Sequence, residues 1–361
     1  MSYLSFKTCV TYHGPSTKAL FEGLLSQKTH HAQVLQGDYF SISDFGESQN
    51  YQDKITHWLN LQLEELVQTW DKSTAERWGI VFASTKGIIE DIVWDQNPPK
   101  GDPYESILTR LVNKFPYPVK KSIAISNACS SGHGAIEMAQ RWLSRDHVDH
   151  VFVFGADLIG PFTMKGFTSL RALSETKKLQ PFDKNRDGLI LGDGIASVVV
   201  SQKLTAQRAL KISPVHTLCE GSSATRPDIT GKNLAQCFAK ASQSVADVVL
   251  AHGTGTFYND LTESNAIYKF FNKQTPPVVT TSKWSVGHTL GVSGLIDLCL
   301  AAEILENNVA PAIATLQQSD LEIAEWLLTE HLEKPMNTVL ISSLGFGGIC
   351  SAMEICKVKS L

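Results

Sequence analysis

The chain has 361 residues, of which 43% are hydrophobic, and it carries a formal net charge of −4. This length allows a large core in one domain or in two fused halves, and the near-neutral charge argues against general nucleic-acid binding. The N-terminus lacks the charged residues and apolar core of a signal peptide, and no stretch approaches the roughly 18 apolar residues of a membrane span. The seven cysteines are scattered and form no CxxC pair, which predicts reduced thiols in a cytoplasmic protein.

The first half of the chain alternates between strand-like and helical stretches. Apolar residues recur at helical spacing over 17–25, 55–70, 104–115 and 134–144. Residues 10–14 suggest the end of a short strand, and apolar runs predict buried strands over 78–84, 122–125, 150–155 and 188–201. Loops are expected at 97–103 and through 156–190. The strand, helix and strand over 122–155 predict a βαβ unit with parallel strands and a right-handed crossover.

The second half repeats this alternation after the composition turns polar near Lys203. Strands are expected over 245–251, 278–281, 338–344 and 351–357, and helices over 261–271 and 292–306. The last two strands predict an antiparallel hairpin joined by a glycine loop. The class is therefore α/β, with a boundary near 205 that divides the chain into halves 1–205 and 206–361.

One sharp turn between a strand and a helix, residues 126–134, carries a cysteine at its corner. Cys129 there meets the free N–H groups and the positive end of the helix dipole, and both favour the thiolate. Small neighbours such as Ala128 and Gly132 leave room for a substrate. Cys129 is therefore the candidate nucleophile.

Two histidines share this setting of a strand end followed by glycine. His252 lies in Ala-His-Gly-Thr-Gly-Thr and His288 follows Gly287. Ligand sites of α/β proteins lie at such strand ends. Two neutral imidazoles beside a thiol can polarise a thioester oxygen and hold a developing enolate. His133, one helical turn after Cys129, is expected to pack or to cap.

Three rival interpretations use the same residues. A zinc site of one cysteine and two histidines lacks a ligand pair with short spacing. A cysteine hydrolase leaves the second histidine and Lys283 without a role. The glycines after His252 resemble a dinucleotide loop only superficially, because the third glycine is missing at the required place.

The glycine loop of the predicted hairpin, Gly345-Phe346-Gly347-Gly348, also has two interpretations. It can be a plain turn. It can also be a mobile loop that lines a pocket, with the Phe346 ring as a gate and the Phe346 N–H as an oxyanion donor.

Five motifs occur in the order found in the β-ketoacyl-[acyl carrier protein] synthases, which the chain resembles over roughly residues 75–357. They are Ala128–Gly132, Pro181–Gly188, Ala251–Thr256, Lys283–His288 and Gly345–Gly348. The resemblance implies the thiolase fold, in which two similar α/β halves stack as five layers, αβαβα, usually in a dimer.

The resemblance also implies roles for single residues. Cys129 would take an acyl chain from acyl carrier protein, and His252 with His288 would drive malonyl decarboxylation and stabilise the enolate. Lys283 and Glu263 match positions that order the histidine site. The N–H groups of Cys129 and Phe346 would form the oxyanion hole. The positions that match the pantetheine and acyl contacts are Thr254, Thr256, Gly345, Gly347 and Gly348. No cofactor is implied, because the phosphopantetheine arm of the carrier protein brings the substrates.

Departures from the family pattern suggest a specialised synthase. The usual glycine- and proline-marked opening is absent, and Leu344 and Ile349-Cys350 replace the common residues around the glycine loop. The chain looks similar to the smaller subunit of the paired synthases of bacterial aryl-polyene clusters, in which one chain condenses and a chain-length factor shapes the tunnel. The alternatives to an active condensing enzyme are therefore a chain-length factor in a heterodimer and a degradative thiolase with Cys350 as its second cysteine. The setting of Cys350 does not suit the thiolase.

The expected partners are acyl carrier protein and a second ketosynthase subunit, in a homodimer or a heterodimer. A local excess of basic residues offers a surface for the acidic carrier protein, although a solvated loop accounts for it equally well. These residues are Lys165, Arg171, Lys177 and Lys178.

Overall fold

Two buried helices form the centre of the molecule in the computed structural model, which describes residues 2–27, 32–34, 37–42, 50–70, 76–94, 101–203, 210–221 and 223–358. Helix α10 (Ser293–Asn307) is buried at every position from Ser293 to Leu305, because apolar side chains cover its whole circumference. It contacts helix α5 (Ser131–Ser144), which buries its first six residues. Helix α1 (Thr17–Leu25) packs against α10 as well.

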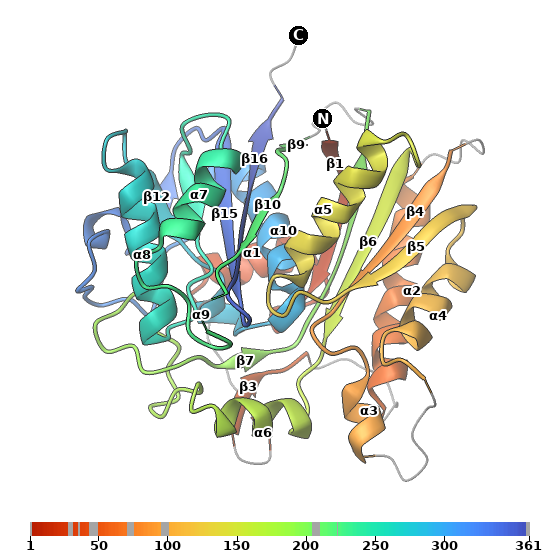
Figure 1. Ribbon diagram of the computed structural model, residues 1–361, viewed down its shortest axis with the longest axis horizontal. Coiled ribbons are helices and arrows are strands. Elements are labelled where there is room, and N and C mark those ends of the chain that lie inside the picture. The colour runs from red at the N-terminus through yellow and green to blue at the C-terminus, as the bar shows by residue number, and fades with distance from the viewer. Residues whose placement is uncertain are drawn as a thin grey trace.

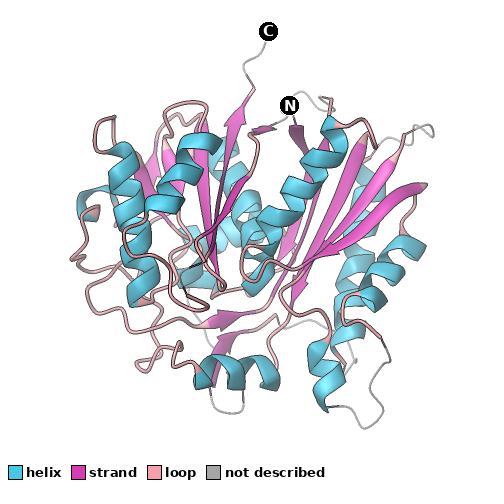
Figure 2. Cartoon of the chain, in the orientation of Figure 1, coloured by secondary structure: helices cyan, strands magenta, loops and turns pink. Residues whose placement is uncertain are grey.

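A large sheet of 11 strands surrounds this central layer (Figures 1 and 2). Its order is β12 (Val278–Thr280), β11 (Val248–Leu250), β15 (Thr338–Gly345), β16 (Ile349–Lys357), β9 (Leu210–Ile212), β1 (Ser2–Val10), β8 (Gly194–Ser201), β6 (His150–Asp157), β4 (Trp78–Ala83) and β5 (Val119–Ile125), with β10 (His216–Cys219) beside β16. Strand β1 pairs with both β8 and β9, and β9 pairs with β16. The two halves therefore share one hydrogen-bonded sheet.

Two further helix pairs cover the outer faces of the sheet. Helices α2 (Tyr51–Thr69) and α4 (Glu105–Lys114) pack on the strands of the first half. Helices α7 (Lys232–Ala241) and α8 (Phe257–Phe271) contact each other, and α7 packs on β10, β15 and β16. The single sheet forms two of the layers, one in each half. Outer helices, strands, central helices, strands and outer helices therefore follow one another across the molecule, which confirms the predicted α/β class and its five layers (Figure 1).

The smaller elements lie around this stack. They are α3 (Ile89–Trp94), α6 (Pro161–Ser169), α9 (Lys283–Val286), the 3₁₀ turns Leu290–Val292 and Ala324–Trp326, a small sheet of β2 (Ala32–Val34), β3 (Gly37–Phe40) and β7 (Leu191–Gly192), and the pair β13 (Val309–Ala310) and β14 (Leu332–Glu333). Among the described residues, no helix combines the length and apolar composition that crossing a membrane requires.

Most predicted elements are confirmed, and two predictions are wrong, those for β1 and α6. Strand β1 extends over nine residues, although only the end of a short strand was expected there. Strands β5 and β6 are parallel, as the predicted βαβ unit requires, and β4 lies between them and is parallel to both. Helix α6 forms inside the predicted loop region 156–190. The predicted boundary at 205 and part of the predicted loop 97–103 lie outside the described residues.

Candidate active site

The turn before α5 brings Cys129 to the wall of a cavity of about 430 Å³. Ala128 adopts a left-handed conformation (φ +49°), and the N–H groups of Ser130 and Ser131 donate to the carbonyls of Asn127 and Ala128. Gly132 lets α5 approach α10, since a Cβ there would lie 2.9 Å from the Leu295 nitrogen. The result is a nucleophile that is only 5% exposed and fixed at the start of a buried helix.

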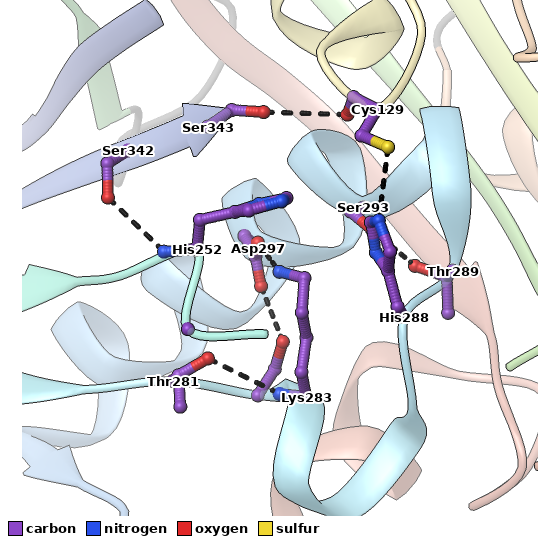
Figure 3. Close-up of polar contacts among 12 residues, drawn as sticks. Cys129, His252, Thr281, Lys283, His288, Thr289, Ser293, Asp297, Ser342 and Ser343 are labelled. Atoms are coloured by element: carbon purple, nitrogen blue, oxygen red, sulfur yellow. Dashed lines mark hydrogen bonds and ion pairs between the residues drawn. The ribbon is translucent and has the colours of Figure 1, made fainter. Parts of the chain in front are cut away.

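His288 is the direct partner of this thiol. Its Nε2 lies 3.1 Å from the Cys129 Sγ, and its Nδ1 lies 3.3 Å from the Ser293 hydroxyl (Figure 3). The Ser293 hydroxyl lies in turn 3.0 Å from that of Thr289. Because either hydroxyl can donate, the pair can match either tautomer of His288.

His252 faces His288 edge to face, with ring centroids 5.2 Å apart at 90°. The carboxylate of Glu263 holds the His252 backbone by accepting the N–H groups of His252 (2.7 Å) and Gly253 (2.6 Å). The Ser342 hydroxyl donates to the same carboxylate at 2.7 Å. The structure thus brings Cys129, His252 and His288 together at one cavity, with Glu263 behind them.

Lys283 lies beneath the two histidines as a buried cation (Figure 3). Its Nζ lies 3.3 Å from an oxygen of Asp297, and the other oxygen of that carboxylate accepts the Ser282 hydroxyl at 2.6 Å. Sequence reasoning missed Asp297, Ser293 and Ser342. Asp297 carried a usable signal, because an acid within an apolar helix requires a buried partner.

Burial sets the charge state of the three central groups. It raises the pKa of the Cys129 thiol to about 12, although the N–H groups of Phe346 and Cys129 act in the opposite direction. The N–H groups at this turn favour the thiolate, as expected, but desolvation outweighs them, so the thiol stays protonated in the free protein. Burial, followed by the charge of Lys283, lowers the pKa of His288 to about 3 and that of His252 well below its ordinary value. Both imidazole rings are therefore neutral, the state in which each can donate one N–H bond to a thioester oxygen.

The glycine loop lies directly against the nucleophile. Gly347 (φ +87°) and Gly348 (φ +73°) allow the tight turn between β15 and β16. A Cβ at Gly345 would lie 3.1 Å from the Asn127 carbonyl oxygen. The Phe346 N–H acts on the Cys129 thiol and lowers its pKa, while the Phe346 ring stacks on Phe167 of α6 with the ring centroids 5.9 Å apart.

The remaining predicted residues separate into those that line the cavity and those that do not. Thr254 and Thr256 line it, with their hydroxyls 2.9 Å apart. Gly345 and Gly348 also line it, whereas Gly347 does not.

Of the four basic residues proposed as a carrier-protein surface, Arg171 lines the cavity, whereas Lys177 and Lys178 line a separate, smaller one. Sequence reasoning missed Arg226, which also lies at the main cavity. Within the described part of the chain, no three histidine, cysteine or acidic side chains gather in a metal-binding group.

Two profiles of one protein family match the chain. Residues 121–206 match the family profile described as "Beta-ketoacyl synthase, N-terminal domain", and residues 212–317 match "Beta-ketoacyl synthase, C-terminal domain". The chain belongs to the β-ketoacyl synthase family. Its predicted family membership is therefore confirmed.

The curated relatives are less than 30% identical to this chain over the matched regions. The 3-oxoacyl-[acyl-carrier-protein] synthase 2 of Coxiella burnetii is 28% identical over 256 residues, which are 66% of this chain and 62% of the relative. The actinorhodin polyketide putative β-ketoacyl synthase 1 of Streptomyces coelicolor is 29% identical over 252 residues, or 64% and 54% of the two chains. The matched regions thus span little more than half the length of these relatives.

Solved structures show the same fold over nearly the whole chain. A ketosynthase, ApeO, in complex with its chain length factor, ApeC, from Xenorhabdus doucetiae matches with a TM-score of 0.84 and 21% identity, covering 99% of this chain and 98% of the other. A complex titled as a type II polyketide carrier protein with its ketosynthase, AntDE:AntF, matches with a TM-score of 0.85 and 18% identity, covering 99% of both chains.

Proposed function

We propose that this synthase joins an acyl chain held on Cys129 to a malonyl unit held on acyl carrier protein, with loss of carbon dioxide. The observation that carries the proposal is the 3.1 Å contact between the Cys129 thiol and the neutral His288, with His252 beside them. A hydrolase would need only one of the two histidines. Two neutral rings on one cavity suit an intermediate whose negative charge forms on a thioester oxygen.

Acyl transfer to Cys129 begins from a protonated thiol, because burial raises its pKa to about 12. His288 Nε2 is positioned to take the thiol proton as the sulfur attacks the incoming thioester. The same proton then passes to the sulfur of the departing phosphopantetheine arm. His288 is thereby neutral again, and the acyl group remains on Cys129.

Decarboxylation uses both histidines as donors. The malonyl carboxylate leaves as carbon dioxide, and its electron pair moves into the thioester to form an enolate. His252 and His288 then donate N–H bonds to the enolate oxygen. For His288 this requires that its proton move from Nδ1 to Nε2 after acyl transfer, and the Ser293 hydroxyl, which accepts from Nδ1–H in the first tautomer, then donates to Nδ1 in the second.

Condensation follows when the enolate carbon attacks the thioester on Cys129. The N–H groups of Cys129 and Phe346 hold the resulting oxyanion, and its collapse expels the Cys129 thiolate. The thiolate then takes up the one proton that the overall reaction consumes, which comes from water. Both substrates arrive on the phosphopantetheine arm of acyl carrier protein, so the chain uses no cofactor of its own. We place the reaction in the cytoplasm, where the seven cysteines remain reduced.

A second candidate function is that of a chain-length factor, in which this chain shapes a partner's product. The likeness to the ApeO–ApeC pair favours it, as do the altered residues Leu344, Ile349 and Cys350 around the glycine loop. The narrower proposal of an aryl-polyene pathway rests on the resemblance of the sequence to the smaller subunit of the paired synthases of such clusters. The presence of Cys129 with His252 and His288 favours the condensing role.

One experiment separates the two functions. The chain is purified alone and after co-expression with a neighbouring synthase subunit, and acylation of Cys129 by acyl carrier protein and product formation are followed by mass spectrometry. We expect Cys129→Ala to abolish both, whereas Cys356→Ser, at the far end of β16, leaves both unchanged. Full product formation by the Cys129→Ala complex would instead identify a chain-length factor.

A further inference from the structure

The histidine loop, residues 252–255, is held through its backbone by two acids of α8. The Glu263 carboxylate accepts the N–H groups of His252 and Gly253 at 2.7 and 2.6 Å. The Asp260 carboxylate accepts that of Gly255 at 3.2 Å. Both acids are 0% exposed. Three of the four backbone N–H groups of the loop therefore donate to these two side chains.

Asn259, at the start of α8, joins the two acids. Its amide nitrogen lies 3.0 Å from the Asp260 Oδ1 and 3.0 Å from the Glu263 Oε2. An amide nitrogen carries two N–H groups, so each acid can receive one of them. Residues four apart share one face of a helix, which brings Glu263 to Asn259. Asn259 is 7% exposed and also lines the cavity that contains Cys129.

The same network includes the Pro181–Gly188 motif, to which the proposed mechanism gives no role. Phe182 adopts a left-handed conformation (φ +61°), and its N–H group donates to the second oxygen of Asp260 at 2.7 Å. At the end of the motif, the Gly188 N–H donates to the Gly255 carbonyl at 3.1 Å. The motif therefore contacts the histidine loop both directly and through Asp260.

Two acids buried within reach of one amide require donors in place of water. Burial raises the pKa of Asp260 to about 7, and the Phe182 N–H and the Asn259 amide act in the opposite direction. Burial also raises the pKa of Glu263, against the charge of Lys283. Among the described residues, Asn259 is the side chain that donates to both acids.

We propose that Asn259 is a positioning residue, whose amide joins the carboxylates of Asp260 and Glu263 and thereby fixes the histidine loop. Without the amide the two acids repel each other, and the N–H groups of the loop lose the fixed position of their acceptors. The His252 ring then no longer stays opposite the His288 ring.

The consequence for catalysis rests on the proposed function. Stabilisation of the enolate requires both His252 and His288, whereas acyl transfer to Cys129 requires His288 alone. Loss of the Asn259 amide should therefore slow decarboxylation and spare acylation.

The first test is independent of activity. Asn259→Leu removes both donors at similar side-chain volume, and hydrogen exchange of the full-length protein is read by mass spectrometry on a peptide that spans the histidine loop. We expect exchange about tenfold faster than in the wild type, the equivalent of one lost hydrogen bond to a charged acceptor. The matched control is Asn265→Leu on the same helix, whose amide donates to the Ile229 carbonyl at 2.7 Å. Unchanged exchange in Asn259→Leu would overturn the inference.

The second test measures the two half-reactions separately. Asn259→Leu should decarboxylate malonyl-acyl carrier protein about tenfold more slowly than the wild type. Acylation of Cys129 should change less than twofold, which also shows that the variant is folded. Equal losses in both half-reactions would show a general structural role and overturn the inference. Absent decarboxylation in the wild type, with loop exchange as expected, would refute the proposed function alone.

The third test uses Asn259→Asp, which keeps the shape of the side chain but adds a third acid. The charged side chains that act on the cluster are Lys283 of α9 and Arg186 of the Pro181–Gly188 motif. At about pH 8 the acids repel one another, whereas towards pH 6 the cluster takes up a proton, whose O–H replaces an amide N–H. Decarboxylation relative to the wild type at the same pH should then recover about tenfold.

A role in shape alone gives no such recovery, since Asn259→Asp has the wild-type shape at every pH. The ratio for Asn259→Leu should stay constant over the same range, because leucine does not titrate. A ratio for Asn259→Asp that stays constant, or that falls as the pH is lowered, would contradict the positioning role of the amide.

Discussion

Neutral groups, rather than ions, occupy the centre of this site. The Cys129 thiol is protonated because burial raises its pKa, and His252 and His288 are neutral because burial and Lys283 lower theirs. A site with this charge state can transfer a proton within the 3.1 Å contact between sulfur and imidazole. It does not need to hold a separated ion pair in a poorly solvated cavity.

The rate of Cys129 acylation should therefore change little between pH 5 and pH 8. A histidine whose pKa is lowered to about 3 is already the neutral base at pH 5, so no activity is gained on passing its ordinary value of 6.5. A single-turnover assay with an acyl carrier protein thioester checks this, with circular dichroism at each pH as the control for folding. A tenfold rise per pH unit would show reaction through a preformed thiolate, and a midpoint near 6.5 would show a solvated base.

The sequence was sufficient to find Cys129, His252 and His288, because each follows a strand and adjoins a glycine or other small residue. Asp297, Ser293 and the partner of His133 were not predictable in the same way. Their roles depend on contacts between elements far apart in the chain, such as that between Ser351 and His133. No local pattern specifies which buried polar groups meet across two packed helices and a sheet.

At the scale of elements, glycines determine how closely α5 and α10 approach. Gly132 faces Leu295, and Gly294 faces His133. The sequence predicted both helices from their apolar spacing, but it did not predict which faces would meet. The same limit applies to strand order, because the βαβ pattern of β5, α5 and β6 does not show that β4, which precedes both strands in the chain, lies between them.

Gly294→Ala should destabilise the protein by about 1–3 kcal/mol, the usual cost of overpacking a core. The added Cβ would lie 2.6 Å from the His133 ring and 3.3 Å from its backbone nitrogen, which outweighs the better helix propensity of alanine. Gly166→Ala is the matched control, because it lies within α6 with no atom within 4 Å. That variant should gain about 0.5–1 kcal/mol. Urea unfolding measures both, and equal stability of the two variants would contradict the prediction.

At the scale of the whole molecule, the two predicted halves share a sheet and a core. The largest core cluster includes Val198 of β8, Leu298 of α10 and Phe238 of α7. The repeated α/β pattern did suggest two units. It could not show that β1 and β9 join them, because a three-residue strand such as β9 leaves almost no pattern in a sequence.

The chain should therefore unfold in a single transition rather than half by half. The buried thiols of Cys9 in β1 and Cys237 in α7 report on the two halves. Pulsed alkylation at increasing urea concentrations, read by mass spectrometry, should give one midpoint for both. Two separated midpoints would show that the halves are independent domains.

The position of β1 also bears on how the protein is made. Its residue Tyr3 pairs with Ser201 of β8 and with Lys211 of β9, so neither neighbour exists when β1 leaves the ribosome. At about 5–20 residues per second, synthesis of the missing partners takes roughly 10–40 s. During that interval the apolar side of β1 is available to chaperones. Strand β1 therefore cannot fold until β8 and β9, which lie about 200 residues later in the chain, have been synthesised.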